Sequence, residues 1–150
     1  MSTAGALLAS PLAVWERDGL KAALAKTGLP IDDVDNPHAL FWRFETAADI
    51  PAGFGGLEIH APDALLRSVV TLPQLRGLGI GRAIVSALEV EARARKCSSV
   101  FILTTSQAEF FARLGYRSCA RDLVPEAIRR SPQFNALCCA DAAVMVKKGL

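Results

Sequence analysis

The stretch "RGLGIGR", Arg76 to Arg82, places glycines at positions 77, 79 and 81 between two arginines. A β-branched apolar run precedes it and an amphipathic run follows it, so the chain is expected to pass from a strand through this turn into a helix. N–H groups at a helix start have no partner within the helix, and glycines leave out the Cβ atoms that would block close approach. The stretch therefore predicts a phosphate-binding turn, to which Arg76 and Arg82 add positive charge.

Two common phosphate-binding motifs do not fit this turn. A Walker loop needs Gly-Lys followed by Ser or Thr where the sequence has Gly81, Arg82 and Ala83. The dinucleotide pattern G-x-G-x-x-G has Arg82 at its last glycine position. A tight corner that binds no ligand is the alternative that the glycines leave open.

The elements around the turn alternate between strands and helices, which predicts one continuous α/β or α+β unit. The three consecutive strands are expected to form an antiparallel meander, and Ser106 and Gly115 to cap and end the short helix. The expected elements are a strand around 7–14, a helix over 16–28, a loop or brief turn over 30–37, strands over 39–46, 53–61 and 64–72, a long helix from 79, a strand over 98–105, a short helix over 106–116, a strand near 116–120, a helix over 125–131 and a last strand over 141–148.

Composition favours a single domain over residues 1–150, because 150 residues with 51% hydrophobic content are enough for one core. The net charge of +2 gives no indication of a nucleic acid or membrane-surface partner. No segment has the roughly 18 uninterrupted apolar residues of a membrane helix. The four cysteines lack C-x-x-C spacing, so no metal site is expected. We expect a soluble cytoplasmic protein; whether it forms a homodimer is left open.

The pattern R-x-x-G-x-G, formed by Arg76, Gly79 and Gly81 within "PQLRGLGIG", resembles the GNAT superfamily of acetyl-CoA-dependent N-acetyltransferases. The segments "VVTLPQLRGLGIGRAI", "VFILTT" and "AEFFARLGY" follow in the order of that family, and the resemblance covers most of the chain. It implies a mixed central sheet of about six to seven strands, flanked by helices, whose fourth and fifth strands splay apart.

The resemblance also implies direct transfer from acetyl-CoA, the co-substrate, to the amine of a small molecule. The backbone of Val69, Val70 and Thr71 would pair with the pantetheine arm, with the Val70 N–H steadying the developing oxyanion. Thr104, Thr105 and Phe111 would line the far side. The pyrophosphate would be held at the helix start by Arg76, Gly77, Leu78, Gly79, Ile80, Gly81 and Arg82.

In many GNAT enzymes a tyrosine at the position of Phe111 acts as the general acid that protonates the departing thiolate. This chain lacks that tyrosine. Tyr116, the only tyrosine, is expected to be structural.

A narrower resemblance is to small GNAT proteins associated with arsenic-resistance operons. It is carried by "LLRS", "LTTSQAEFFARLGY", "RDLVPEAIRRSPQFNALC" and "AAVMVKK", although these proteins usually have proline where this chain has Cys139. It implies that Gln133 and Phe134, with Cys138, shape the acceptor pocket. A sister group acts on the α-amino group of an arsenic-containing glutamate mimic, which suggests an amino-acid-like acceptor.

Ionisable side chains in the middle of expected strands are the candidates for the acceptor chemistry. Glu58 could act as a general base, directly or through water; otherwise it is a solvated outer-face residue or an ion-pair partner of a neighbouring arginine. Arg43 and Arg67 could bind the carboxylate of the acceptor by a bidentate fork, or form ion pairs across the sheet. His60, near a strand end, is either a loop-edge residue or a proton carrier.

Two rival functions stay open. One is acetyl transfer to protein or peptide amines, and the other is a non-catalytic acyl-CoA-binding domain, towards which the missing tyrosine points. Mid-strand Glu58 and Arg67 favour a small polar acceptor over both.

Overall fold

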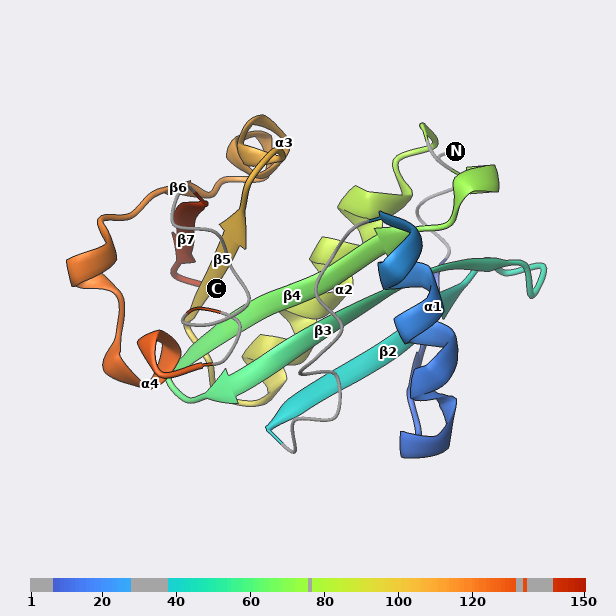
Figure 1. The fold of residues 1–150 in the computed structure, drawn as a ribbon, viewed down its shortest axis with the longest axis horizontal. Coiled ribbons are helices and arrows are strands. Elements are labelled where there is room, and N and C mark those ends of the chain that lie inside the picture. The colour runs from blue at the N-terminus through green and yellow to red at the C-terminus, as the bar shows by residue number, and fades with distance from the viewer. Residues whose placement is uncertain (1–6, 28–37, 76, 132–133, 135–141) are drawn as a thin grey trace.

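The computed structural model describes residues 7–27, 38–75, 77–131, 134 and 142–150 (Figure 1). Its strands form one seven-stranded sheet in the order β1-β2-β3-β4-β5-β7-β6. The elements are β1 (Leu8–Pro11), η2 (Val14–Glu16), α1 (Arg17–Thr27), β2 (Ala39–Glu45), β3 (Pro51–His60), β4 (Asp63–Thr71), η3 (Pro73–Leu75), α2 (Ile80–Ala94), β5 (Ser99–Thr104), α3 (Ala108–Arg113), β6 (Arg117–Ser118), η4 (Arg121–Leu123), α4 (Glu126–Arg129) and β7 (Ala143–Lys148).

The sheet is mixed. β2, β3 and β4 pair as the expected antiparallel meander. β4 and β5 pair in parallel, and the other neighbouring strands are antiparallel. The long connection between β4 and β5 contains α2, as a parallel crossover requires.

Helices cover both faces of the sheet, with α2 on one face and α1 and α4 on the other (Figure 1). α2 buries an apolar stripe at helical spacing that includes Ile80, Ile84 and Leu88, which pack on β2, β3 and β4. On the opposite face Leu20 and Leu24 of α1 pack near one end of the sheet, forming one cluster. Val124 and Ile128, from the end of η4 and from α4, pack over β4, β5 and β7 and form a second cluster on that face.

Several boundaries differ from the sequence expectation. β1 is short and leads into η2 rather than reaching residue 14. Gln107, not Ser106, caps α3; its N–H donates to Thr104 Oγ1 at 2.9 Å, so the end of β5 holds the helix start. Gly115 follows α3 with a φ of 97°, as its expected role requires. The segment 30–37 lies outside the described residues.

The feature that positions the site is the divergence of β4 from β5. The two strands pair only from Asp63 with Ser99 to Leu66 with Ile102, and beyond this point they separate (Figure 1). A bulge sets Ser68 and Val69 of β4 against one residue of β3, and Ser68 has a left-handed φ of 58°. Because a bulge bends its strand, it supports the splayed arrangement expected for the fourth and fifth strands.

Candidate functional site

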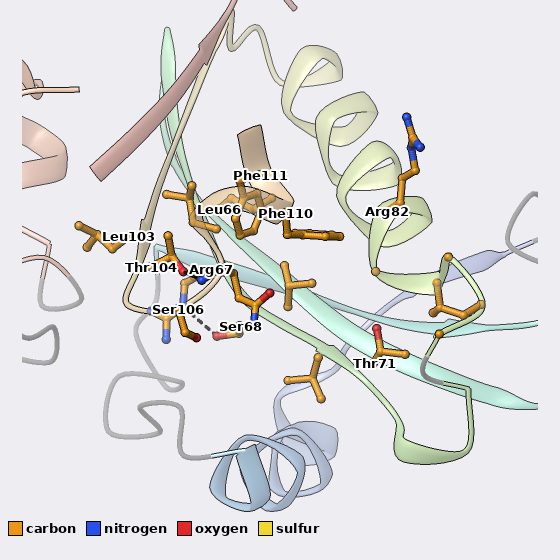
Figure 2. A pocket seen from close by; sticks show the side chains of 18 residues that line it. Leu66, Arg67, Ser68, Thr71, Arg82, Leu103, Thr104, Ser106, Phe110 and Phe111 are labelled. Carbon is orange, nitrogen blue, oxygen red and sulfur yellow. Dashed lines mark hydrogen bonds between the residues drawn. The ribbon is translucent and has the colours of Figure 1, made fainter. Parts of the chain in front are cut away.

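A cavity of about 720 Å³ fills the gap between the separating strands. Its walls are β4 from Leu66 to Thr71, the glycine turn at the start of α2, the end of β5 and the start of α3. Figure 2 shows Arg67, Ser68 and Thr104 at one end of this cavity, and Thr71 and Arg82 near the glycine turn at the other. Because successive strand residues face opposite sides of the sheet, the lining by both Leu66 and Arg67 means that the cavity reaches through the sheet.

The glycine turn forms the outer end of the cavity. Gly77 and Gly79 have φ values of 82° and 77°, in the left-handed region, and Gly79 caps α2 without a side-chain hydrogen bond. A Cβ on Gly77 would meet no atom within 4 Å, so the space beside this backbone is open. Gly77, Gly79, Ile80, Gly81 and Arg82 line the cavity, and Leu78 is 46% exposed at the tip of the turn. Arg76 lies outside the described residues.

The edge of β4 that faces the gap forms one side of the cavity, through Val69, Val70 and Thr71. The Leu72 N–H donates to the Ala52 carbonyl of β3 at 2.8 Å. Backbone groups alternate between the two edges of an antiparallel strand, so the Thr71 N–H is directed to the opposite edge, where the gap lies.

The same alternation directs the Val70 amide toward β3. A Cβ on Gly53 of β3 would collide with the Val70 carbonyl oxygen, which agrees with this orientation. The oxyanion role expected for the Val70 N–H does not fit this geometry, because the amide belongs to the β3–β4 ladder.

The β5 and α3 side of the cavity carries Thr104 and Phe111, as expected. Thr104 is 9% exposed, and Phe111 is buried in edge-to-face contact with Phe110 and Tyr116. The Tyr116 hydroxyl donates to Glu89 at 2.9 Å. Burial, and then the Glu89 carboxylate, raise the pKa of Tyr116 far above its ordinary value. Tyr116 does not line the cavity and holds its proton within the core, which is a structural role.

A buried polar cluster closes the inner end of the cavity. Arg67 lines the cavity and is 2% exposed; its Nη1 lies 3.4 Å from Glu58 Oε2. Glu58 is 1% exposed, and its Oε2 also accepts a hydrogen bond from Ser131 Oγ at 2.9 Å. His60 Nε2 lies 3.4 Å from Glu58 Oε1. Of the alternatives left open for Glu58, the geometry shows the ion pair with a neighbouring arginine, and Glu58 is absent from the described residues that line the cavity.

Ser131 is the member of this cluster that sequence reasoning did not assign to the site. Its hydroxyl reaches a residue 73 positions away in the chain, and it follows α4 rather than a strand. Nothing in its local sequence identifies Glu58 as the partner.

The other residues expected near the acceptor lie elsewhere. Arg43 pairs with Glu16 and, at 2.9 Å, with Glu45, and it does not line the cavity. Two carboxylates therefore occupy its guanidinium, the ion-pair alternative. Phe134 packs against the cluster under α4, with the Arg121 guanidinium 5.3 Å from its ring centroid, and is not among the described lining residues. Gln133, Cys138 and Cys139 lie outside the described residues.

The part of the chain that the structure describes contains no group of three His, Cys, Asp or Glu side chains that could hold a metal ion. Among the described helices, none is long and apolar enough to cross a membrane.

The sequence pattern of a family described as "Acetyltransferase (GNAT) domain" matches residues 37–118, from β2 through α2 to β6. The chain belongs to the GNAT acetyltransferase family. Within that family, 67 of its residues are 34% identical to an uncharacterized N-acetyltransferase of Chlorobaculum tepidum, covering 45% of this chain and 43% of that one. A segment of 74 residues is 38% identical to N-alpha-acetyltransferase 80 of Mus musculus. It covers 47% of this chain and 24% of that protein. These matches span less than half the length of either relative.

Solved structures show that this is the GNAT fold. N-acetylglutamate synthase of Neisseria gonorrhoeae, complexed with coenzyme A and L-arginine, superposes with a TM-score of 0.76 at 17% identity, over 95% of this chain and 33% of that one. Rv2747 of Mycobacterium tuberculosis, in complex with CoA and a further ligand, superposes with a TM-score of 0.76 at 23% identity. The superposition covers 95% of this chain and 99% of Rv2747. Both of these GNAT structures hold CoA.

Proposed function

We propose that this GNAT chain is an N-acetyltransferase that uses acetyl-CoA to acetylate the amine of a small, amino-acid-like acceptor. The observation that carries the proposal is the cavity in the β4–β5 gap, which begins at the glycine turn and ends at the buried Arg67. One end offers backbone N–H groups suited to phosphates, and the other offers a guanidinium suited to a carboxylate.

The described residues fit acetyl-CoA as co-substrate. The space beside Gly77 is open, and the cavity of about 720 Å³ runs from the turn along the edge of β4 that faces the gap. Acetyl-CoA would supply the acetyl group as a reactive thioester. The chain would hold its phosphates at residues 77–82 and pair with its amide arm through the edge of β4. Thr71 lies near the glycine turn and would therefore be beside the phosphate end of the co-substrate rather than beside the acetyl group.

At the acceptor end we assign Arg67 to the carboxylate of the acceptor. Arg67 lines the cavity with a buried side chain, and its guanidinium is held by Glu58 and by the Ser68 hydroxyl, which accepts from Nε at 3.2 Å. Glu58 then acts on the acceptor through Arg67 rather than as a base. A structure of Neisseria gonorrhoeae N-acetylglutamate synthase, 19% identical with a TM-score of 0.75, holds coenzyme A and N-acetyl-glutamate. An N-acetylated amino acid on this fold supports an acceptor of that class.

The resemblance of the C-terminal segment to arsenic-operon GNAT proteins adds arsenic-containing amino acids to the acceptors worth testing. The matched residues that the structure describes include Pro125, Ser131 and Phe134, of which Ser131 contacts the acceptor-end cluster.

The test is release of free thiol from acetyl-CoA by the purified chain, with mass spectrometry of the acceptor. The panel contains ordinary amino acids, phosphinic and arsenic-containing amino acids, and a peptide mixture. Arg67→Ala is compared with Arg117→Ala, which removes an exposed arginine on β6, and retained CoA binding shows that each variant is folded. Acetylation of amino acids that R67A loses and R117A keeps is the expected result.

Other outcomes reject the proposal. Acetylation of peptides alone would make the chain a peptide acetyltransferase. Binding of acetyl-CoA with no acceptor consumed would make it an acyl-CoA-binding domain.

A further inference from the structure

We infer that Ser131 is a positioning residue that acts through Glu58 on Arg67 and so sets the preference of the site for acceptors that carry a carboxylate. The inference rests on the proposed function and deepens it, because it names the residue that tunes acceptor choice without lining the cavity itself.

The three side chains form a continuous buried chain of contacts across three elements. Ser131 follows α4 and is 3% exposed, and its Oγ donates to Glu58 Oε2 on β3 at 2.9 Å. The same carboxylate oxygen lies 3.4 Å from Nη1 of Arg67 on β4. Glu58 Oε2 is thus the acceptor for both Ser131 and Arg67. The hydrogen bond from Ser131 therefore holds the carboxylate in the position at which it pairs with Arg67.

Contacts with Phe41, Ser68 and Glu58 restrain the guanidinium of Arg67. The Phe41 ring lies against it, with 5.3 Å between its centroid and Cζ. Nε donates to Ser68 Oγ in the bulge, and Nη1 meets Glu58. A planar guanidinium offers a carboxylate two donors only in a narrow range of orientations, so a shift of Glu58 changes how Arg67 presents itself to the cavity.

The position of Ser131 is itself fixed by the packing of α4. Ile128 of α4 is fully buried against Leu65 and Phe101, and the Ser131 N–H donates to the Ile128 carbonyl at 3.0 Å. The hydroxyl therefore reaches Glu58 from the end of a helix that is packed against the sheet. This connects the C-terminal part of the chain to the acceptor end of the cavity.

Charge burial gives a further reason to assign this cluster to the acceptor. Glu58 and Arg67 lie on the sheet face that also carries the apolar clusters under α1 and α4. Taking two charges out of water costs more than their attraction usually returns, so a buried ion pair is a poor means of stabilising a fold. A fixed cation at the end of a cavity is instead useful for recognising an anionic group.

The experiment compares acceptors that differ only in the carboxylate. The probes are the amino acid with the highest turnover in the panel and its α-carboxamide, and the readout is the ratio of their kcat/KM values. Ser131→Ala is expected to lower this ratio about tenfold, the effect of losing one hydrogen bond to a charged group. The change should appear in the KM of the amino acid, with kcat and the KM for acetyl-CoA retained.

Three further variants make the result specific. Ser131→Thr keeps the hydroxyl and should restore the ratio, which a general loss of packing would not do. Ser131→Cys keeps the volume with only a weak donor and should behave like S131A, so it replaces S131A if that variant does not fold. Ser99→Ala removes a partly buried hydroxyl at the start of β5 and should leave the ratio unchanged.

The outcomes separate the inference from the function on which it rests. Wild-type turnover with an unchanged ratio in S131A and S131C overturns the inference and leaves the acetyltransferase standing. An equal fall in S99A also overturns it. A wild-type chain that releases no thiol with any acceptor contradicts the proposed function, and the inference with it.

Discussion

Removing one partner of the Glu58–Arg67 ion pair is expected to destabilise the fold far more than removing both. The two residues are 1% and 2% exposed, so neither can turn to water without opening the core. Glu58→Leu leaves the Arg67 guanidinium buried beside an apolar side chain, which costs about 3–5 kcal/mol. Arg67→Met leaves the carboxylate without its cation and costs a similar amount.

The double variant E58L/R67M should recover most of this loss. Replacing a buried ion pair by apolar residues of similar volume is often neutral or stabilising, by about 1–4 kcal/mol. In the double variant, Ser131 has lost the carboxylate that accepts its hydrogen bond. This loss lowers the free energy of unfolding by about 1 kcal/mol. The double variant is therefore expected within about 2 kcal/mol of wild type, and it should bind CoA but no longer acetylate amino acids.

Urea unfolding followed by the fluorescence of Trp15 and Trp42 measures these free energies. With a slope of about 2 kcal/mol per molar urea, each single variant should lower the midpoint by about 2 M. Glu126→Gln, which breaks an exposed pair with Arg130, serves as the control and should cost at most about 1 kcal/mol. Single variants as stable as this control, or a double variant that loses as much stability as the two single variants together, would contradict this prediction.

Three other predictions address the glycine turn, the edge of β4 and the buried tyrosine. Gly77→Ala should cost about 1–2 kcal/mol of stability through its left-handed φ and weaken CoA binding, measured by calorimetry, because its Cβ enters open space beside the turn. Thr71→Pro removes an N–H on the edge of β4 that faces the gap and should weaken CoA binding, whereas Val70→Pro should disrupt the β3–β4 ladder; equal affinity of T71P and wild type for CoA would contradict the pairing of β4 with the amide arm. Tyr116→Phe should leave the pH profile of activity unchanged. Because the folded chain raises the pKa of Tyr116 above 10.0, stability from this group is present below pH 10 and lost above it, so wild type should lose stability at alkaline pH that Y116F does not.

Much of the fold was predictable from the sequence because its signals are local. The apolar period of α2, the three short strands before it and the glycine turn are each encoded within about a dozen residues. The structure confirms these elements to within a few residues. The splaying of β4 from β5 followed from the resemblance to GNAT proteins rather than from periodicity.

The site was less predictable because its decisive contacts are distant in the chain. Sequence alternation identified Glu58 and Arg67 as unusual mid-strand charges but not that they meet, since the strand register decides this. The Ser131 contact depends on the packing of α4, and the pairing of Arg43 with Glu16 depends on where η2 lies. The left-handed φ of Ser68 in the bulge could not be predicted, because the residue at this position is not a glycine.

A crystal structure of the chain with CoA and the acetylated product of its best acceptor would show whether co-substrate and acceptor meet in the β4–β5 gap. We expect phosphates at the amides of residues 77–82, the acetamide in the β4–β5 gap, and the product carboxylate against Arg67. CoA bound at another surface, or a product that lies away from Arg67, would contradict it.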